Sequence, residues 1–428
     1  MNVALPEMGR TLGGSTAGLQ WVVDAYTLMF AALLISAGAV SDRVGAKRLF
    51  GVGLAAFMAA SAACGLAPGL AFLIGGRAVQ GCAAAVMLPA SLALVRQAFS
   101  DPVRRAKAIA LWSVGGAVAI AAGPVAGGVL TSAVSWRAIF FVNLPVGLVT
   151  LALLARAPRS PRRAVPLDPA GQVTAIAGLA ALTFGVIEGG ETGFGRPVVL
   201  GCLLLAAASM GAFVIAETRA AHPMVPLGMF RRWTVTACVS IGFAINVAFY
   251  GQIFVLSLFF QRILGESAVT AGLMFLPMTA LLASANLTSA KVAASFGPRV
   301  VIWTGLLVSA LGMAALFVVC TGHGLVILAV VLVPAGLGMG FALPSLTTTL
   351  LDAIPADQAG LAAGMLNSSR QAGGTLAVAV FGALVAQRAA FVSGMRDSIL
   401  IGVLMLLAAT AAGLTLPSRR AVEAKEMS

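Results

Sequence analysis

The chain has 428 residues, of which 60% are hydrophobic and only 10% are charged. A soluble core cannot bury so many apolar residues, so most of the chain must lie in lipid. The formal net charge of +13 could suggest a nucleic-acid-binding protein, but the basic residues lie in short loops between apolar segments, as the positive-inside rule predicts, and no nucleic-acid partner is expected.

Long apolar segments follow one another along the whole chain, and each approaches the ~20 residues that a membrane-spanning helix needs. Most of the 27 Lys and Arg residues fall in every second loop, beginning with the loop after the first segment, which places these loops in the cytoplasm. We therefore predict an all-α, multi-pass protein of a bacterial inner membrane with about thirteen spans. The predicted segments are 18–40, 49–68, 71–95, 106–131, 138–156, 170–188, 197–216, 236–260, 268–290, 300–320, 324–350, 360–386 and 398–416.

An internal repeat divides the chain into two related parts. Gly45 and Gly297 each lie in a basic loop, and the stretch 81–89 matches the stretch 336–344. Such a period is typical of transporters built from two homologous helical halves. We expect an N-terminal half, a central part with polar linkers and two extra helices, a C-terminal half and a cytoplasmic tail, over residues 1–156, 157–232, 233–416 and 417–428.

Signals of an enzyme or a metal site are missing from the sequence. The five Cys lie in apolar segments without metal-ligand spacing, and neither paired carboxylates nor a His cluster indicates a membrane-embedded enzyme. No phosphate-binding Gly-x-x-x-x-Gly-Lys-Ser/Thr motif is present, which excludes ATP hydrolysis as the energy source. We expect no metal and no cofactor, and a proton gradient as the source of energy.

The loop after the first predicted span joins glycines, an acid and basic residues in one pattern, Gly38-Ala-Val-Ser-Asp-Arg-Val-Gly-Ala-Lys-Arg48. Gly38 and Gly45 permit a tight turn and close helix approach, and Asp42 can pair with a basic side chain or a helix N-terminus. This pattern resembles the signature loop of the major facilitator superfamily; a plain basic anchoring loop is the alternative. The residues expected to hold the loop on the cytoplasmic side are Arg43, Lys47 and Arg48.

The stretch Arg77-Ala-Val-Gln-Gly81 resembles the fourth-helix motif of the same superfamily, in which the arginine is implicated in proton transfer. A charge within a membrane span costs about 2.5–3.5 kcal/mol on insertion scales, so Arg77 should face a partner or a water-filled cavity. The alternative is a structural arginine that binds backbone carbonyls.

The stretch Gly123-Pro-Val-Ala-Gly-Gly128 resembles the antiporter motif of exporters. Pro124 removes a helix hydrogen bond and bends the helix, while Gly123, Gly127 and Gly128 give a flat face for close packing. The resemblance implies a bend that blocks inward leak and favours efflux. Ordinary packing of small residues between membrane helices is the alternative.

Three further features resemble the fourteen-span drug:proton antiporter branch of the superfamily. They are the two extra central helices, the stretch from Trp136 to Gly147 and the stretch from Leu361 to Gly374. The sequence of residues 19–28 resembles that of methylenomycin A and puromycin resistance exporters. The resemblance implies two six-helix halves, alternating access, and proton-coupled export of small amphipathic drugs by a monomer. An exporter of an endogenous metabolite or siderophore, and an inactive or non-transporting chain, are the alternatives.

One departure from this branch concerns the first helix. The branch has an acidic residue just upstream of the Asn-Val-Ala-Leu-Pro that this chain keeps at Asn2 to Pro6. These residues are similar to the outer end of a helix, so we expect a true first helix to lie upstream of Met1. A real thirteen-helix chain is the alternative.

Asp24 and Arg77 are the candidates for proton coupling. Each lies about six residues, or roughly 9 Å, below the outer end of its predicted span, and the two spans run in the same direction. We expect the two side chains to approach each other, so that making and breaking the pair lets Asp24 take up and release the coupling proton. The alternative is that Asp24 faces the outer water layer.

Polar residues near mid-membrane are candidates for a substrate cavity. Arg370 lies roughly 15 Å into its span and forms one polar patch at helical spacing with Asn367 and Gln371. Aromatic faces with few hydrogen-bonding groups suit bulky amphipathic molecules, although they could equally pack against neighbours or lipid. The further candidates are the tyrosine that follows Ala25, Tyr26, together with Asn246, Tyr250 and Gln252.

Overall fold

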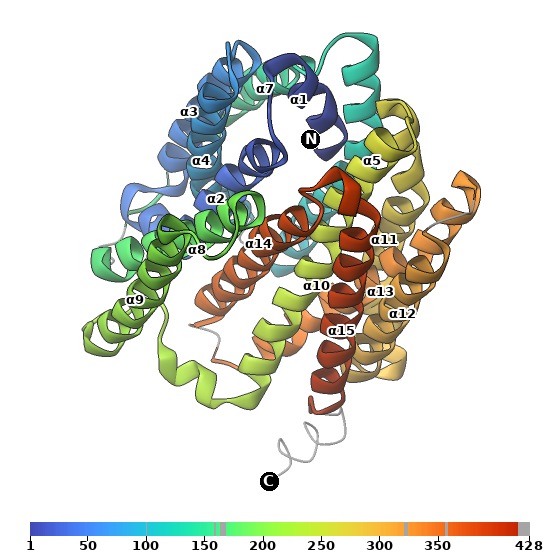
Figure 1. Ribbon diagram of the computed structural model, residues 1–428. Coiled ribbons are helices and arrows are strands. Elements are labelled where there is room, and N and C mark those ends of the chain that lie inside the picture. Colours follow the sequence, from blue (N-terminus) through green and yellow to red (C-terminus); the bar gives the residue numbers. More distant parts are fainter. Residues whose placement is uncertain (100, 158–159, 163–167, 321–323, 356–357, 418–428) are drawn as a thin grey trace.

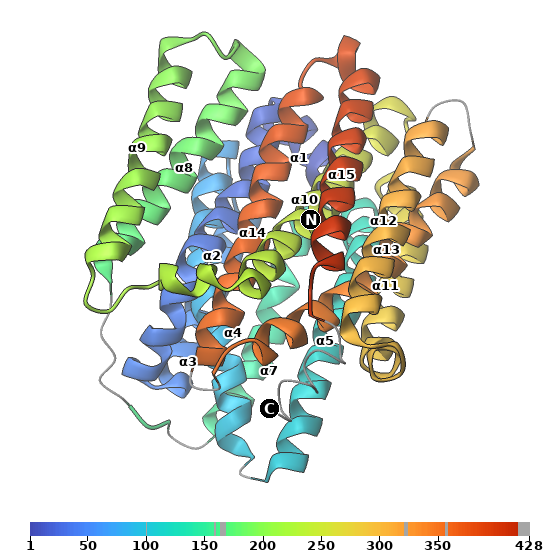
Figure 2. The ribbon, with the colours of Figure 1, turned by 90° about the horizontal axis from the view of Figure 1, so that it is seen from below.

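The computed structural model describes residues 1–99, 101–157, 160–162, 168–320, 324–355 and 358–417. Long helices lie side by side in one bundle, and no strand occurs among these residues (Figure 1 and Figure 2). The predicted all-α polytopic fold is therefore confirmed. The predicted tail lies, apart from Pro417, outside the described residues.

The helices fall into three groups along the chain. The first group is η1 (Asn2–Ala4), α1 (Leu5–Leu12), α2 (Thr16–Val44), α3 (Ala46–Gly65), α4 (Leu70–Ala98), α5 (Pro102–Ala133), α6 (Ala138–Phe141) and α7 (Asn143–Ala155). The extra pair is α8 (Pro169–Thr192) and α9 (Pro197–Arg219). The last group is η2 (Leu227–Arg231), α10 (Trp233–Leu258), η3 (Phe259–Ile263), α11 (Ala268–Phe296), α12 (Pro298–Val319), α13 (Leu325–Asp352), α14 (Ala359–Leu384), η5 (Arg388–Ala390) and α15 (Phe391–Leu414).

A helix occurs at each of the thirteen predicted spans. In the described part of the chain, 12 helical stretches are long and apolar enough to cross a membrane, with α6 and α7 forming one of them. The remaining predicted span corresponds to α14, whose polar stretch 367–371 makes it less apolar than its neighbours. Because α14 packs between α2 and α10, these polar groups have helix neighbours and need not face lipid.

The internal repeat reappears in the packing of equivalent helices. Gly45 ends α2 and Gly297 ends α11, and both have positive φ, +95° and +84°, which favours glycine. Gly81 of α4 lies against the carbonyl oxygen of Tyr26, and Gly336 of α13 lies in the same way against that of Met278. Equivalent glycines thus let the second and fourth helices of each half pack backbone to backbone.

The extra pair covers the line along which the two halves meet. α8 packs against α9 on one side and against both α2 and α14 on the other, at one edge of the bundle (Figure 1 and Figure 2). Glu191 Oε1 accepts the backbone N–H of Ala17 at 2.9 Å, and Gln172 Nε2 donates to the carbonyl of Ala32 at 2.8 Å. These contacts fix α8 to α2 near both of its ends.

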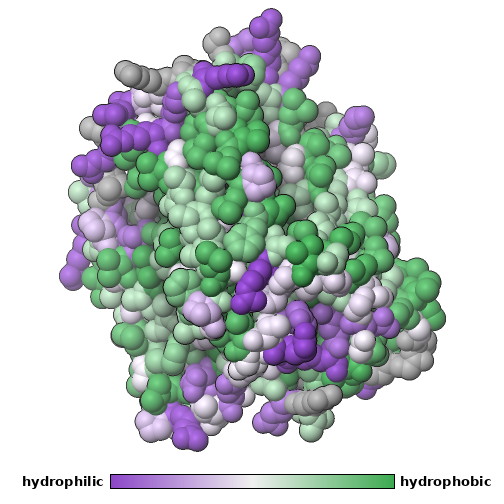
Figure 3. Space-filling model, turned by 90° about the horizontal axis from the view of Figure 1, so that it is seen from above, coloured by the Kyte–Doolittle hydropathy of each residue, from purple (hydrophilic) through white to green (hydrophobic). Residues whose placement is uncertain are grey.

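The surface is apolar where lipid would surround it. Figure 3 shows hydrophobic side chains over much of the middle of one face, with hydrophilic side chains at its upper edge, on its left side and in its lower part. Large apolar residues are exposed along single helix faces, for example Leu200, Leu204 and Val214 on α9. In water such a surface would drive aggregation, whereas a bilayer solvates it.

Candidate functional site

The two halves meet along two helix pairs, α2 with α14 and α5 with α11. In the first pair, Thr375 donates a hydroxyl hydrogen bond to Thr27 at 2.9 Å, and Ser368 donates to the carbonyl of Ala31 at 3.0 Å. Small and hydroxyl-bearing residues therefore hold the two halves together here by hydrogen bonds to backbone and to each other.

The antiporter-motif residues lie in the second pair, α5 with α11. A Cβ built on Gly128 would lie 2.5 Å from the carbonyl oxygen of Ala268, and one built on Gly272 would lie 2.5 Å from that of Pro124. The predicted close packing is therefore present at Gly128, on the predicted external side. Gly123 has nothing within 4 Å, and Gly127 lies near no residue of α11, so close packing does not extend to these two glycines.

Arg77 is held against α2 by groups that carry no formal negative charge. Its Nε donates to the carbonyl of Val22 at 3.0 Å, and its Nη1 donates to Oε1 of Gln80 at 2.9 Å. The guanidinium carbon lies 4.2 Å from the centre of the Tyr26 ring, which is a cation–π distance. The carbonyl contact matches the alternative reading of Arg77 as a structural arginine.

Asp24 is fully buried, and neither carboxylate oxygen has a hydrogen-bond partner among the described residues. It lies between Gln20 and Thr27 on one face of α2, the face that contacts α14. The alternative that Asp24 faces the outer water layer is therefore wrong, because the side chain is 0% exposed.

Asp24 and Arg77 do not approach each other in this conformation, so the expected pair, which would form and break during the transport cycle, stays a prediction. Arg77 contacts α2 at Val22 and Tyr26, which precede and follow Asp24 by two residues. Two residues turn an α-helix by about 200°, so Asp24 points away from the face that Arg77 contacts. The depth estimate placed both residues at one level, but the depth of a residue does not determine its direction around the helix axis.

Arg370 forms the polar cluster expected near mid-membrane. Its Nε donates to Oδ1 of Asn246 at 3.3 Å and its Nη1 donates to Oδ1 of Asn367 at 3.2 Å. Tyr250 lies next to this cluster, since a Cβ on Gly374 would be 3.1 Å from its ring. The structure thus brings together Asn246, Asn367, Arg370 and Tyr250, while Gln371, one residue further along, is half-buried with no hydrogen bond to a described residue.

Gln252 does not belong to this cluster. It lies two residues after Tyr250, so it points to the opposite side of α10, where it lines a small cavity with Met313, Met395 and Ser398. Both side-chain amide atoms of Gln252 are buried without a partner among the described residues. In this conformation Gln252 therefore lies apart from the Arg370 cluster, and its expected role in a substrate cavity stays a prediction.

Only some residues of the signature loop have the positions and contacts that the sequence predicts. Gly45 makes the turn between α2 and α3, but Gly38 lies inside α2 with nothing within 4 Å of a Cβ, so it permits neither a turn nor a close approach. Asp42 is exposed and has no ion pair or hydrogen bond with another described residue, contrary to the expected pairing. Arg43 and Arg48 are exposed at this end of the bundle.

Lys47 is the residue of this loop with the most extensive contacts. Its Nζ donates to the carbonyl of Ala155 at 3.0 Å and to that of Ala157, so it binds the C-terminal end of α7. Its backbone N–H donates to Oγ of Ser160 at 3.0 Å, and Ser160 donates in turn to Gln97 at 2.6 Å. A lysine at a helix C-terminus also interacts favourably with the helix dipole.

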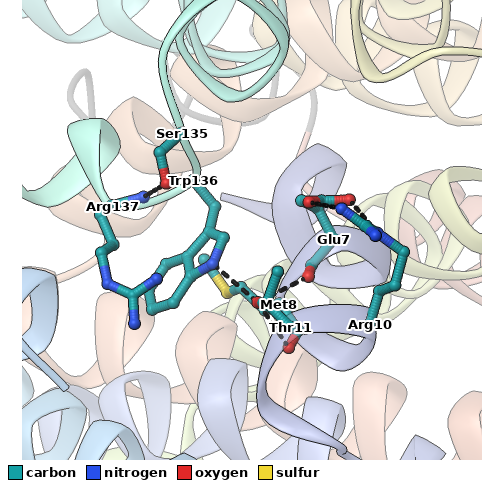
Figure 4. Close-up of polar contacts among 7 residues, drawn as sticks. All are labelled: Glu7, Met8, Arg10, Thr11, Ser135, Trp136 and Arg137. Carbon is teal, nitrogen blue, oxygen red and sulfur yellow. Dashed lines mark hydrogen bonds and ion pairs between the residues drawn. The ribbon is translucent and has the colours of Figure 1, made fainter. Parts of the chain in front are cut away.

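A separate cluster lies at the predicted external end, where α1 meets the Trp136 stretch (Figure 4). Trp136 Nε1 donates to Oγ1 of Thr11 at 2.9 Å, and the Arg137 guanidinium stacks 4.3 Å from the Trp136 ring. On α1, hydrogen bonds from Arg10 lower the pKa of the Glu7 carboxyl. The Arg10–Glu7 pair is the only ion pair among the described residues. Asp24, Arg77 and Arg370 therefore have no charged partner among these residues.

Two residues of this site went unnoticed in the sequence. Gln80 binds Arg77 from the next turn of α4, and its position within the Arg77–Gly81 motif could have indicated it. Gln20 donates from α2 to two backbone carbonyls of α14, at Val378 and Ala379. A glutamine one turn before Asp24 on the same face was the available signal. A cavity of about 380 Å³ lies elsewhere, between η3, the segment after α14 and the start of α15, and no candidate residue lines it.

Comparison with known proteins identifies the family. Residues 1–378 match the model of the Major Facilitator Superfamily. The chain is 33% identical over 429 residues to the methylenomycin A resistance protein of Bacillus subtilis, covering 100% of this chain and 92% of that protein. It is 36% identical over 388 residues to the puromycin resistance protein pur8 of Streptomyces alboniger, covering 89% and 76%. It is 35% identical over 391 residues to the multidrug resistance protein Stp of Mycobacterium tuberculosis, covering 90% and 72%.

Solved structures agree at the level of the fold. A D-xylose–proton symporter matches with a TM-score of 0.67 at 14% identity, covering 97% of this chain and 94% of that one. A transporter of the POT family in complex with 5-aminolevulinic acid matches with a TM-score of 0.68 at 12% identity, covering 93% and 88%. With the family model, the helical bundle and the resistance-protein relatives in agreement, the chain belongs to the major facilitator superfamily and is a membrane transporter rather than an enzyme.

Proposed function

We propose that this chain exports small amphipathic drug-like molecules across a bacterial cytoplasmic membrane in exchange for protons. The drug part of the proposal is supported by relatives at 33–36% identity whose names refer to antibiotic resistance. The proton part is carried by one observation, the fully buried carboxyl of Asp24 at the interface of the two halves.

Asp24 suits a proton-binding role because of its surroundings. An ionised carboxylate here would be buried without a counter-ion, which is costly, so the neutral acid fits this conformation. A rocking motion that separates α2 from α14 would expose Asp24 to water and favour release of the proton. Asp24 therefore links the proton to the interface that alternating access must open and close.

The substrate would lie near the Arg370 cluster and the aromatic rings of Tyr26 and Tyr250. Close packing of α5 on α11 at Gly128 and Gly272 supports a conformation that is closed on the predicted external side. In the other direction along α5, Leu111 and Val118 are exposed. These features are consistent with a state that is open towards the cytoplasm, from which a drug would be loaded.

Uptake by everted membrane vesicles tests the proposal. Vesicles with an acidified lumen should take up radiolabelled puromycin, and a protonophore should abolish the uptake. Asp24→Asn should reduce both puromycin uptake and puromycin-dependent proton release to background, because the amide cannot exchange a proton. The matched control is Asp397→Asn, an exposed aspartate on α15, which should transport normally. Unchanged proton flux in Asp24→Asn would refute the proton part, and absence of any drug uptake by the wild type would refute the drug part.

A further inference from the structure

A buried polar junction lies where α2, α8 and α14 meet. Apolar residues from all three helices, Ala17, Ile187 and Ala379, form a small buried cluster there. Three polar side chains near it are 0% exposed: Gln20 and Asp24 on α2, and Thr183 on α8. Oε1 of Gln20, both oxygens of Asp24 and Oγ1 of Thr183 have no hydrogen-bond partner among the described residues.

Helix register places Thr183 within one helical turn of the level of Asp24. Along α2, Trp21 contacts Phe184 with ring centres 6.1 Å apart, and Ala32 accepts a hydrogen bond from Gln172. Between these contacts, Asp24 lies level with about residue 181 of α8, two residues from Thr183. Thr183 follows Gln172 by eleven residues, close to three helical turns, so it lies on the same α2-facing side of α8.

The hydrogen-bond capacity of Gln20 depends on the proton of Asp24. Gln20 uses both amide hydrogens to bind α14, at the carbonyls of Val378 (3.0 Å) and Ala379 (2.8 Å). Its remaining oxygen can only accept, and an ionised Asp24 one turn away can also only accept. A protonated Asp24 can instead donate to Gln20. The hydroxyl of Thr183 can donate to the ionised form, as can that of Thr27, which lies beside the Asp24 carboxyl on the next turn of α2.

We propose that Gln20 and Thr183 are positioning residues that couple the proton on Asp24 to the contact between α2 and α14. With the proton present, Asp24 donates to Gln20 Oε1 and keeps the amide hydrogens directed at α14. When the proton leaves, the carboxylate repels that oxygen, the amide turns, and the hold on Val378 and Ala379 is lost. Thr183 then donates to the carboxylate, which makes the extra helix α8 part of the proton site.

Charged groups on the packed helices do not compete for Asp24 in this arrangement. On α4, Arg77 contacts the opposite face of α2 together with the titratable Tyr26. On α14, Arg370 binds Asn246 and Asn367, and on α8 the carboxylate of Glu191 binds the start of α2. The described faces that meet at Asp24 are therefore uncharged apart from Asp24 itself.

Spin-label distances between α2 and α14 test the inference, which rests on the proposed role of Asp24. Nitroxides at Ser15→Cys and Gln387→Cys, both exposed at the predicted external ends, report the separation in a chain whose five native Cys are replaced by Ala. No drug is needed. The wild type should show a short distance at low pH and a longer one at high pH, and Asp24→Asn should stay short throughout.

Substitutions of Thr183 and of Gln20 should change the spin-label distance in different ways. Thr183→Val should raise the pH midpoint of the distance change by about one unit, because the ionised carboxylate loses its donor. Thr183→Ser should restore the midpoint, and the control Thr304→Val, whose hydroxyl binds its own helix α12, should not move it. Gln20→Met should give the long distance at all pH values, since the link to α14 is gone.

The inference is overturned if the wild-type spin-label distance does not change with pH, or if Asp24→Asn shows the same pH-dependent change as the wild type. It is also overturned if Thr183→Val leaves the pH midpoint of the distance change where it is in the wild type. These outcomes are distinct from failure of the proposed function. Loss of drug-dependent proton flux with an intact spin-label response would remove the exporter proposal alone. Normal flux with no spin-label response would remove the Gln20–Thr183 coupling alone.

Discussion

The guanidinium of Arg77 stacks on the ring of Tyr26 at 4.2 Å, so a buried positive charge is accommodated by an aromatic face instead of a carboxylate. A second contact, from Arg77 to the carbonyl of Val22, fixes the same face of α2. The planar guanidinium can stack and donate at the same time, which an ammonium group cannot do. Arg77 therefore joins α4 to α2 within one half of the transporter.

Replacing Arg77 with lysine should weaken this join. We expect Arg77→Lys to lower the free energy of unfolding by about 1–2 kcal/mol, since a desolvated cation–π contact and a charge-assisted hydrogen bond are both impaired. Thermal unfolding in detergent measures the loss. Tyr26→Phe should remain close to wild type because it keeps the ring face, whereas Tyr26→Leu should resemble Arg77→Lys. Equal stability of all three variants would contradict a structural role for the stacking.

Independence of Asp24 and Arg77 is a second prediction. A double-mutant cycle with Asp24→Asn and Arg77→Gln should give a coupling energy below about 0.5 kcal/mol, as expected for residues that do not contact each other. The readout is again thermal unfolding, at neutral pH. The matched cycle of Arg370→Gln with Asn246→Ala should show larger coupling, because those side chains share a hydrogen bond. A coupling of several kcal/mol between Asp24 and Arg77 would indicate that the two side chains form the expected ion pair.

The repeat glycines provide a third prediction. Gly81→Ala and Gly336→Ala would each put a methyl group onto a backbone carbonyl, of Tyr26 and Met278, closer than non-bonded atoms can approach. Backbone cannot move aside as a flexible side chain can, so each change should destabilise the fold by about 1–3 kcal/mol. The control is Gly211→Ala on α9, where a Cβ meets nothing within 4 Å and alanine should be neutral or stabilising. Thermal unfolding separates these outcomes, and similar stability of Gly81→Ala and Gly211→Ala would argue against the close approach.

Hydropathy and glycine patterns allowed much of the fold to be predicted. Each apolar stretch became a helix, since lipid leaves an unpaired backbone no other way to satisfy its hydrogen bonds. Gly45 and Gly297 were recognisable because both stand in short loops between spans, where the chain needs a positive φ. These features depend on local sequence alone, and the structure agrees with them.

The direction of side chains around each helix could not be predicted in the same way. Asp24 and Arg77 lie at similar depths in the membrane, and Tyr250 and Gln252 lie on the same turn of α10. In each pair, however, the two side chains point in different directions and contact different neighbours. A helix that is apolar nearly all round, such as α10, gives little periodic signal about which face meets which neighbour. That information arises from packing of distant segments, as in the contact of Gln20 with Val378.

The contacts of Lys47 lead to a fourth prediction. Lys47→Met should keep the length of the side chain and lose the bonds to the carbonyls of Ala155 and Ala157, at a cost of about 1 kcal/mol for a partly exposed charged donor. The segment after α7 should then detach more often from α3. Limited trypsin digestion at Arg162 measures this, and we expect faster cleavage in Lys47→Met. The control Arg48→Met changes an exposed neighbour and should leave the rate unchanged; equal rates for both variants would mean that Lys47 does not hold the segment.

Two glycines of the antiporter motif should respond in opposite ways to the same small change. Gly128→Ala would place its methyl group 2.5 Å from the carbonyl of Ala268, at the contact between the two halves, so α5 and α11 should be forced apart there. Gly123→Ala meets nothing within 4 Å and adds helix propensity of about 1 kcal/mol. We expect Gly128→Ala to lose transport while remaining folded, because the closed side can no longer form, and Gly123→Ala to transport and to unfold at a slightly higher temperature. Vesicle uptake of puromycin measures transport, with size-exclusion chromatography as the check on folding. If Gly128→Ala transports as well as Gly123→Ala, the contact between Gly128 and Ala268 is not needed for the transport cycle.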